Sequence, residues 1–276
     1  MSVMTMGFDR MGKDTGNLLF LEHINLRVPD QVLATDFYVS ALGMTRDPYY
    51  MVGTNNFWAS QGEQQMHLQE GPAQHFRGEI VIVVRDLKKV SQWLANPGRH
   101  LAGTKFAWES QGDQIVATCP WGNKYLLVEK WPGFNRTRGI PSALIEVPVG
   151  SAEAIAKFYQ EIMGALVRQS HNSPIETKVQ VGPGQHLVYR ETSANIIPYD
   201  GHHICIYAAN PGSIYDWLQV RGLVTLEDNS YQFRFQAIVN PENDETIYEI
   251  EHELRSLHHP LYKRDLVNRT GFEAPP

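Results

Sequence analysis

The spacing of apolar residues changes sharply within the first fifty positions. Residues 23–28 alternate between polar and apolar side chains, which is the period of a half-buried strand. Residues 31–43 instead repeat apolar side chains at the spacing of one helix face, and Gly43 can end that helix. The polar face of the strand carries His23, Asn25 and Arg27. The pattern therefore predicts a strand with a polar face that leads directly into an amphipathic helix.

Related copies of this unit recur along the chain. The pair Phe37-Tyr38 returns as Phe158-Tyr159 at the same distance before a glycine. The first strand and helix of a second unit match those of a fourth, which aligns Glu79 with His203. Each unit fits a strand, a helix and three short strands separated by turn residues. Shared spacing across two elements indicates an internal duplication.

Four such units predict an α+β fold, in which βαβββ modules pair into two tandem domains. A stretch bounded by Pro and Gly, without hydrophobic period, separates the two halves and is expected to be a linker. We expect a flexible lead-in at 1–17, an amino-terminal domain at 18–131, the linker at 132–141, a carboxy-terminal domain at 142–253 and an extended arm at 254–276.

Composition narrows the range of partners. The chain has 276 residues and a net charge of −6 without a basic run, which argues against binding to nucleic acid or an anionic membrane. Cys119 and Cys205 lie in apolar segments and are expected to be buried free thiols in a reducing compartment. No apolar run is long enough to cross a bilayer, and residues 1–17 lack a signal-peptide core. We therefore expect a soluble cytoplasmic protein, either a monomer or a homo-oligomer.

The signature His23-Ile-Asn-Leu-Arg-Val-Pro-Asp30, followed by Phe-Tyr and Leu-Gly, resembles that of the vicinal oxygen chelate superfamily. This superfamily includes glyoxalases, fosfomycin and bleomycin resistance proteins and extradiol dioxygenases. The turn Cys119-Pro-Trp-Gly-Asn123 before a closing strand adds to the resemblance, which covers residues 18–252 and implies glyoxalase-like domains. Two domains of paired units look most like the extradiol dioxygenases. There, first strands and a last strand supply two histidines and one glutamate to a divalent iron.

Matched to this pattern, the amino-terminal half offers four candidate metal ligands. His23 falls on the first-strand position, and Glu79 falls on the same position of the second unit, where a histidine would be usual. His67 lies on the closing strand of the first unit, a ligand position in the glyoxalase branch. On the closing strand of the second unit the position falls on Leu126 if counted from the preceding turn, or on Glu129 if counted from the strand's end. A hydrogen-bonded structural role is the alternative for each histidine.

The carboxy-terminal half departs from the pattern in its third unit, where Leu144 stands in the place of the first-strand histidine. In the fourth unit His203 occupies that position, and Glu249 or Glu251 on the closing strand could supply the carboxylate. His186 could replace the missing histidine. A polar cup that lines an organic pocket without a metal is the alternative for this group.

Further side chains near these strands would act on a substrate. His203, His186 and Tyr207 are the catalytic candidates, as groups that can move protons near the cup. Aromatic residues individually suit sheet packing, but collectively they suit a cavity for an aromatic ligand. These aromatic residues are Tyr49, Tyr50, Phe57, Trp58, Tyr207, Tyr231, Phe233 and Phe235.

Two imidazoles and a carboxylate leave open coordination positions for a chelating substrate and for oxygen. We therefore expect a metal-dependent enzyme that acts on a small, aromatic, oxygen-chelating substrate, like an extradiol dioxygenase with Fe2+. Zn2+, Mn2+, Ni2+ or Co2+ in the same cup would favour a glyoxalase-like isomerase or lyase. A metal-free protein that sequesters its ligand, as resistance members of the superfamily do, is the alternative, and Leu144 and Leu126 favour it. The sequence leaves open which half is active.

Overall fold

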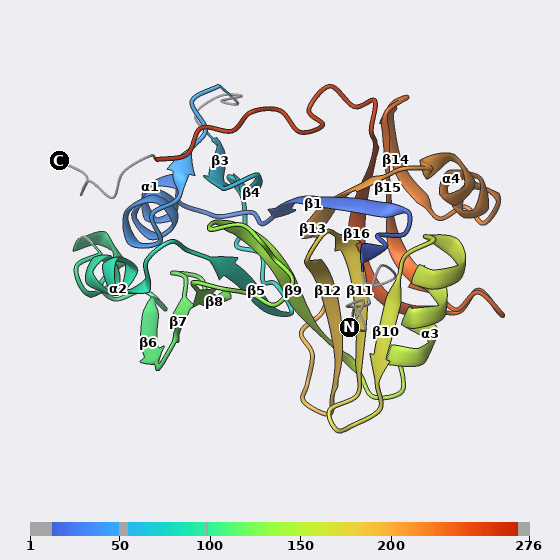
Figure 1. The fold of residues 1–276 in the computed structure, drawn as a ribbon, viewed down its shortest axis with the longest axis horizontal. Coiled ribbons are helices and arrows are strands. Elements are labelled where there is room, and N and C mark those ends of the chain that lie inside the picture. Colours follow the sequence, from blue (N-terminus) through green and yellow to red (C-terminus); the bar gives the residue numbers. More distant parts are fainter. Residues whose placement is uncertain (1–12, 50–54, 98, 270–276) are drawn as a thin grey trace, which may run out of the picture.

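A computed structural model describes residues 13–49, 55–97 and 99–269 of the chain. It contains four successive units of the predicted βαβββ type (Figure 1). The first unit comprises β1 (Leu18–Asn25), α1 (Gln31–Ala34), η2 (Thr35–Ala41), β2 (Thr45–Arg46), β3 (Asn56–Gln61) and β4 (Gln64–Gln69). The second comprises β5 (Gly78–Val83), α2 (Leu87–Ala95), η3 (Arg99–Leu101), β6 (Ala107–Gln111), β7 (Gln114–Thr118) and β8 (Lys124–Val128).

The second half repeats this order of elements. The third unit comprises β9 (Gly139–Pro148), α3 (Ala152–Lys157), η4 (Phe158–Ile162), β10 (Val167–Ser170), β11 (Glu176–Gly182) and β12 (Gln185–Thr192). The fourth comprises β13 (His203–Ala208), α4 (Pro211–Val220), β14 (Val224–Asn229), β15 (Gln232–Val239) and β16 (Thr246–Ser256). The predicted α+β class and its duplicated modules are confirmed. None of the described helices is both long and apolar enough to cross a membrane.

The sequence explains how the first strand passes into its helix. Asp30 ends the extended stretch, and its Oδ1 accepts hydrogen bonds from the backbone N–H groups of Val32 at 2.7 Å and Leu33 at 3.0 Å. The helix α1 continues without a break as the π-helical turn η2. Gly43 follows with φ of 72°, a left-handed conformation that glycine adopts readily. The same cap recurs at α2, where Asp86 accepts from the N–H of Lys89.

The units join in an order that differs from their order in the chain. In the first sheet, with strand order β14-β15-β16-β13-β1-β4-β3-β2, the first unit pairs with the fourth. In the second sheet, with strand order β10-β11-β12-β9-β5-β8-β7-β6, the second unit pairs with the third. The central contacts are the antiparallel pairs β1–β13 and β5–β9. Each sheet therefore contains strands from both halves of the sequence.

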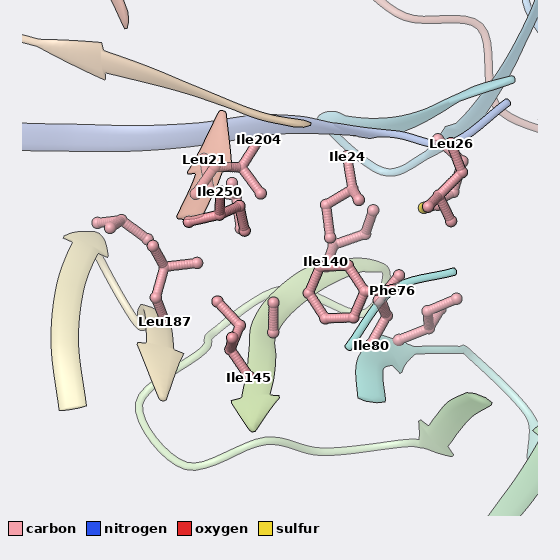
Figure 2. Close-up of a cluster of buried hydrophobic side chains, with 14 of the residues drawn as sticks. Leu21, Ile24, Leu26, Phe76, Ile80, Ile140, Ile145, Leu187, Ile204 and Ile250 are labelled. Carbon is pink, nitrogen blue, oxygen red and sulfur yellow. The ribbon is translucent and has the colours of Figure 1, made fainter. Parts of the chain in front are cut away.

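Apolar side chains of the two sheets meet in one core (Figure 2). Leu21, Ile24 and Ile204 of the first sheet lie opposite Ile145 and Leu187 of the second. The helices lie at the two ends of the molecule, with α1 and α2 at one end and α3 and α4 at the other (Figure 1). Because side chains alternate along a strand, residues next to these core positions face away from the core. That outward face of the first sheet carries the candidate site.

After β16 the chain runs back across the first sheet towards β3 (Figure 1). We call residues 257–269 the arm. The ring of Tyr262 lies 4.9 Å from that of Tyr207 on β13. Farther along, the Asn268 side chain pairs with the backbone N–H and carbonyl of Gly62 at 2.8 Å and 2.7 Å. The arm is thus anchored to both units that build the first sheet.

Candidate metal centre

A β-bulge turns two consecutive side chains of β1 out of the core. The pairing of β1 with β13 shifts register between Leu21, opposite Ile206, and His23, opposite Cys205. The bulge places the side chains of Glu22 and His23 together, and Glu22 Oε2 lies 2.9 Å from His23 Nδ1. A carboxylate only accepts, so Nδ1 carries the proton and Nε2 has a free lone pair.

Three histidines from three neighbouring strands meet at this point. His23 on β1, His67 on β4 and His203 on β13 each bring a ring nitrogen to within 4.8 Å of the others. The ring of His23 lies 5.7 Å from that of His67 and 5.5 Å from that of His203, measured between centroids. Their exposed fractions are only 1%, 7% and 4%. Two histidines predicted as ligands in one half and one predicted in the other therefore form a single cluster.

The protonation of this cluster suits a metal ion. Burial lowers the pKa of His67 far below its ordinary value. Burial also lowers the pKa of His203, although Glu253 acts in the opposite direction. The Nε2 atoms of His23 and His203 are buried and have no hydrogen-bond partner. A buried polar atom without a partner is unfavourable, so these two nitrogens are suited to ligate a cation.

The carboxylate beside the cluster is Glu253, two residues beyond the predicted Glu251. Glu253 Oε2 lies 3.5 Å from His203 Nε2, and the side chain is buried. Burial acts to raise the pKa of Glu253, but neighbouring positive charge, which includes the guanidinium groups of Arg255 and Arg234, outweighs it and holds the pKa well below its usual range. Glu253 is therefore an anion beside His203 Nε2. Two histidines and one carboxylate are a set that binds divalent transition metals.

His67 differs from the other two histidines because both its ring nitrogens are hydrogen-bonded. The Asn25 amide nitrogen lies 2.8 Å from Nδ1, and Asn56 Oδ1 lies 2.6 Å from Nε2. An amide nitrogen only donates, so Nδ1 accepts and Nε2–H donates to Asn56. The ring also stacks on Trp58 at 3.6 Å. His67 would have to break its bond with Asn25 to ligate a metal.

Of the two carboxylates predicted on β16, Glu251 also reaches the cluster, with its Oε2 3.5 Å from His203 Nδ1. Arg234 pairs with both Glu251 and Glu253, but Glu251 is partly exposed whereas Glu253 is buried. Glu249 is exposed and accepts a hydrogen bond from Gln236.

The remaining predicted ligands belong to the second sheet. Glu79 on β5 lies opposite Leu144, and burial raises its pKa. Glu129 follows β8 and accepts from the N–H of Leu87 at the start of α2. His186 on β12 is half-buried and lies beside Ser142. The structure therefore separates these three from the cluster, and every group of three close potential ligands within its described residues includes His23.

Tyr207 lies on β13, on the same face as His203. Arg255 Nη1 donates to its hydroxyl at 3.3 Å. Burial, reinforced by the charge of Glu22, raises the pKa of Tyr207. The phenol therefore stays protonated and can donate, but it is not a base.

Only some of the aromatic residues named in the sequence lie beside the cluster. Trp58 contacts both His67 and His23, with its ring 5.0 Å from that of His23. Phe57, Phe233 and Phe235 are instead buried in the core. Tyr49 and Tyr231 are exposed, and Tyr50 lies outside the described residues.

No model of a known protein family and no curated protein sequence matches the chain. Solved structures do match its fold. Glyoxalase I from Zea mays has a TM-score of 0.57 and 14% identity, over 90% of this chain and 95% of that one. A proposed dioxygenase from Bacillus subtilis subsp. subtilis str. 168 has a TM-score of 0.57 and 15% identity, over 92% of each chain. The cppA protein from Streptococcus pneumoniae TIGR4 has a TM-score of 0.50 and 10% identity, over 87% of this chain and 99% of that one.

These similarities extend over nearly the whole chain and therefore concern its complete architecture. The chain has a glyoxalase-like fold, as its sequence predicted. At these identities the likeness defines the fold, and function has to be argued from the site.

Proposed function

We propose that the protein is a metal-dependent enzyme with one metal centre, held by His23, His203 and Glu253 on the outward face of the first sheet. The observation that carries this proposal is the pair of buried Nε2 atoms without hydrogen-bond partners, one of which, that of His203, lies 3.5 Å from the Glu253 carboxylate. All three residues come from one chain, so a monomer is sufficient to form the centre. A bound divalent ion would act as a Lewis acid that stabilises negative charge on substrate oxygens.

The number of protein ligands bears on the reaction. Two histidines and one carboxylate leave three positions of an octahedral ion open, one more than a chelating substrate needs, and this set is typical of Fe2+ oxygenases. The two hydrogen bonds that engage His67 support this reading. We therefore favour a ring-cleaving dioxygenase that uses Fe2+.

A second candidate is an isomerase or lyase with Zn2+, Mn2+, Ni2+ or Co2+. The observation that favours it is the position of His67, whose ring nitrogen lies within 4.8 Å of those of His23 and His203. If Asn25 releases Nδ1, His67 becomes a fourth ligand and two positions stay open. Two positions suffice for a chelating substrate.

The surroundings of the centre support a small aromatic substrate. The Trp58 ring lies against His23 and His67, and Tyr207 adds a second aromatic side chain to the same face. Aromatic faces offer stacking surface to a planar ring. Glu22 keeps His23 in the tautomer whose Nε2 is free, and Tyr207 supplies a hydroxyl that donates.

Metal analysis of protein purified without chelator or added metal tests the proposal. We expect one metal ion per chain in the wild type, and loss of that ion in His23→Ala, His203→Ala and Glu253→Gln. His186→Ala is the matched control, since it removes a histidine of the second sheet, and it should retain the metal. His67→Asn should also retain the metal if three residues ligate it, and should lose it if four do.

The identity of the metal then selects the assay. Iron, together with oxygen uptake in the presence of catechols, would support the dioxygenase. Zinc, nickel, cobalt or manganese, with loss of metal in His67→Asn, would support the isomerase or lyase. No metal in any preparation, and no thermal shift with added divalent ions, would overturn the metalloenzyme and leave the metal-free sequestering protein as the alternative.

A further inference from the structure

A buried guanidinium lies between the two carboxylates that flank the histidine cluster. Arg255 on β16 has an exposed fraction of 5%. Its Nη1 donates to Glu22 Oε2 at 2.7 Å, and its Nη2 lies 2.6 Å from Glu253 Oε1. Nε donates to Gln232 Oε1 at 3.1 Å. Two nitrogens of the side chain thus donate hydrogen bonds and the third forms an ion pair, and together these contacts fix the plane of the guanidinium.

The contact with Arg255 has a different effect at each of the two carboxylates. Glu22 Oε2 accepts from Arg255 and also from His23 Nδ1–H, so Arg255 helps to hold the acceptor that sets the tautomer of His23. Glu253 Oε1 forms an ion pair with Arg255, whereas Oε2 lies 3.5 Å from His203 Nε2 and accepts a hydrogen bond from Arg234 Nη2. Arg255 thus pairs with the oxygen of Glu253 that is not directed at His203, and a metal ion at Oε2 would displace Arg234.

We propose that Arg255 is a positioning residue of the metal centre, which restricts Glu253 to coordination through Oε2 and, through Glu22, keeps His23 Nε2 directed at the ion. This inference rests on the proposed function. A carboxylate that ligates through one oxygen leaves open a coordination position that a two-oxygen carboxylate would fill. Arg255 therefore preserves one of the positions available to a substrate.

The guanidinium is suited to this role in a way that an ammonium is not. Its planar fork reaches two carboxylates at once with fixed geometry, whereas a lysine presents one compact charge on a flexible stem. Arg255→Lys therefore keeps the positive charge but removes the simultaneous contact with the carboxylates of Glu22 and Glu253. Arg190→Lys is the matched control, because Arg190 pairs with Glu176 at 2.6 Å on the second sheet, outside the candidate site.

Cobalt binding provides the test, with no assay of activity. Co2+ dissociation constants would be measured by chelator competition, and the visible spectrum of bound Co2+ would report its coordination. We expect Arg255→Lys to weaken binding about 10- to 100-fold, as loss of a residue behind a metal ligand typically does, and to alter the cobalt spectrum. Arg190→Lys should match the wild type in both measurements.

The outcomes separate this inference from the function on which it rests. A wild type that binds no Co2+ would overturn both. Tight binding by the wild type, with equal affinity or an unaltered spectrum in Arg255→Lys, would overturn the role of Arg255 alone. Should Arg255→Lys fail to fold, Glu22→Gln serves instead, because it keeps an acceptor for His23 and removes the charge that Arg255 bridges. Weaker cobalt binding by Glu22→Gln is then expected, and wild-type binding would contradict the inference.

Discussion

His252 shows how burial controls protonation at the level of one residue. Its Nδ1 donates to the Ile250 carbonyl at 2.8 Å, so Nε2 accepts from the Tyr159 hydroxyl at 2.5 Å. The imidazole stacks on Phe235 with ring centroids 4.4 Å apart. Burial lowers the pKa of His252 to about 4, although the bond to Ile250 acts in the opposite direction. The folded protein therefore holds this side chain neutral in mildly acidic solution.

The lowered pKa of His252 predicts a loss of stability in acid. Between its unfolded pKa of about 6.5 and its folded pKa of about 4, the unfolded chain binds a proton that the folded chain does not. The contribution is fully present above pH 6.5 and falls as the pH drops towards 4, by on the order of 3 kcal/mol. Urea unfolding of metal-free protein at several pH values measures it.

The control for this prediction is His252→Gln, which keeps a side chain that can donate and accept but does not titrate. Its free energy of unfolding should depend less steeply on pH between 6.5 and 4 than that of the wild type. Identical slopes for the two proteins would show that His252 has an ordinary pKa in the fold.

Some residues of the candidate site could be predicted from the sequence, and one was missed. His23, His67 and His203 could be proposed because each sits on a predicted strand at a recognisable place in a repeated unit. Glu253 was not predicted, although β16 continues to Ser256 and the alternation that pointed to Glu249 and Glu251 extends to Glu253.

Among the elements, the turn from β1 into α1 is the best explained by local sequence. Asp30 accepts two backbone hydrogen bonds at the helix start, where the N–H groups have no partners within the helix. The bulge in β1, by contrast, has no signal in the sequence. It depends on the register with β13, which is set by a strand far away in the chain.

Removal of this helix cap should destabilise the protein without affecting the metal centre. We expect Asp30→Ala to lower the free energy of unfolding by about 1 kcal/mol, because two N–H groups of the first turn lose their acceptor. Asp30→Asn retains a side-chain oxygen and should stay close to the wild type. Chemical unfolding measures both. Equal stability of Asp30→Ala and the wild type would show that solvent replaces the cap at no cost.

For the whole molecule, the number and order of the units followed from the sequence, but their pairing did not. The first strand of every unit has an apolar face, and this face would allow it to pair with the first strand of any other unit. The choice of β13 rather than β5 as the neighbour of β1 depends on the tertiary structure. For this reason Glu79 and Glu129 were predicted to ligate the same metal ion as His23, although they belong to the other sheet. The domain boundary at residues 132–141 stays a prediction.

The pairing predicts how the protein behaves when it is divided within residues 132–141. Fragments 1–135 and 136–276 should fold poorly alone, because each sheet needs strands from both, and should associate when they are expressed together. Copurification through a tag on one fragment measures this association. Introducing His203→Ala into the second fragment should preserve the association and abolish metal binding. A single fragment that unfolds cooperatively on its own would contradict the prediction.

The nested arrangement of the sheets has a consequence for biosynthesis. The second sheet uses a continuous stretch from β5 to β12, so it can form as soon as that stretch has left the ribosome. The first sheet joins the first unit to the fourth, and β1 has to wait for β13 and β16. His23 leaves the ribosome long before His203 and Glu253. The proposed set of ligands is therefore incomplete until the fourth unit has been made, and the proposed centre can take up a metal ion only after the last strand of that unit has joined the first sheet.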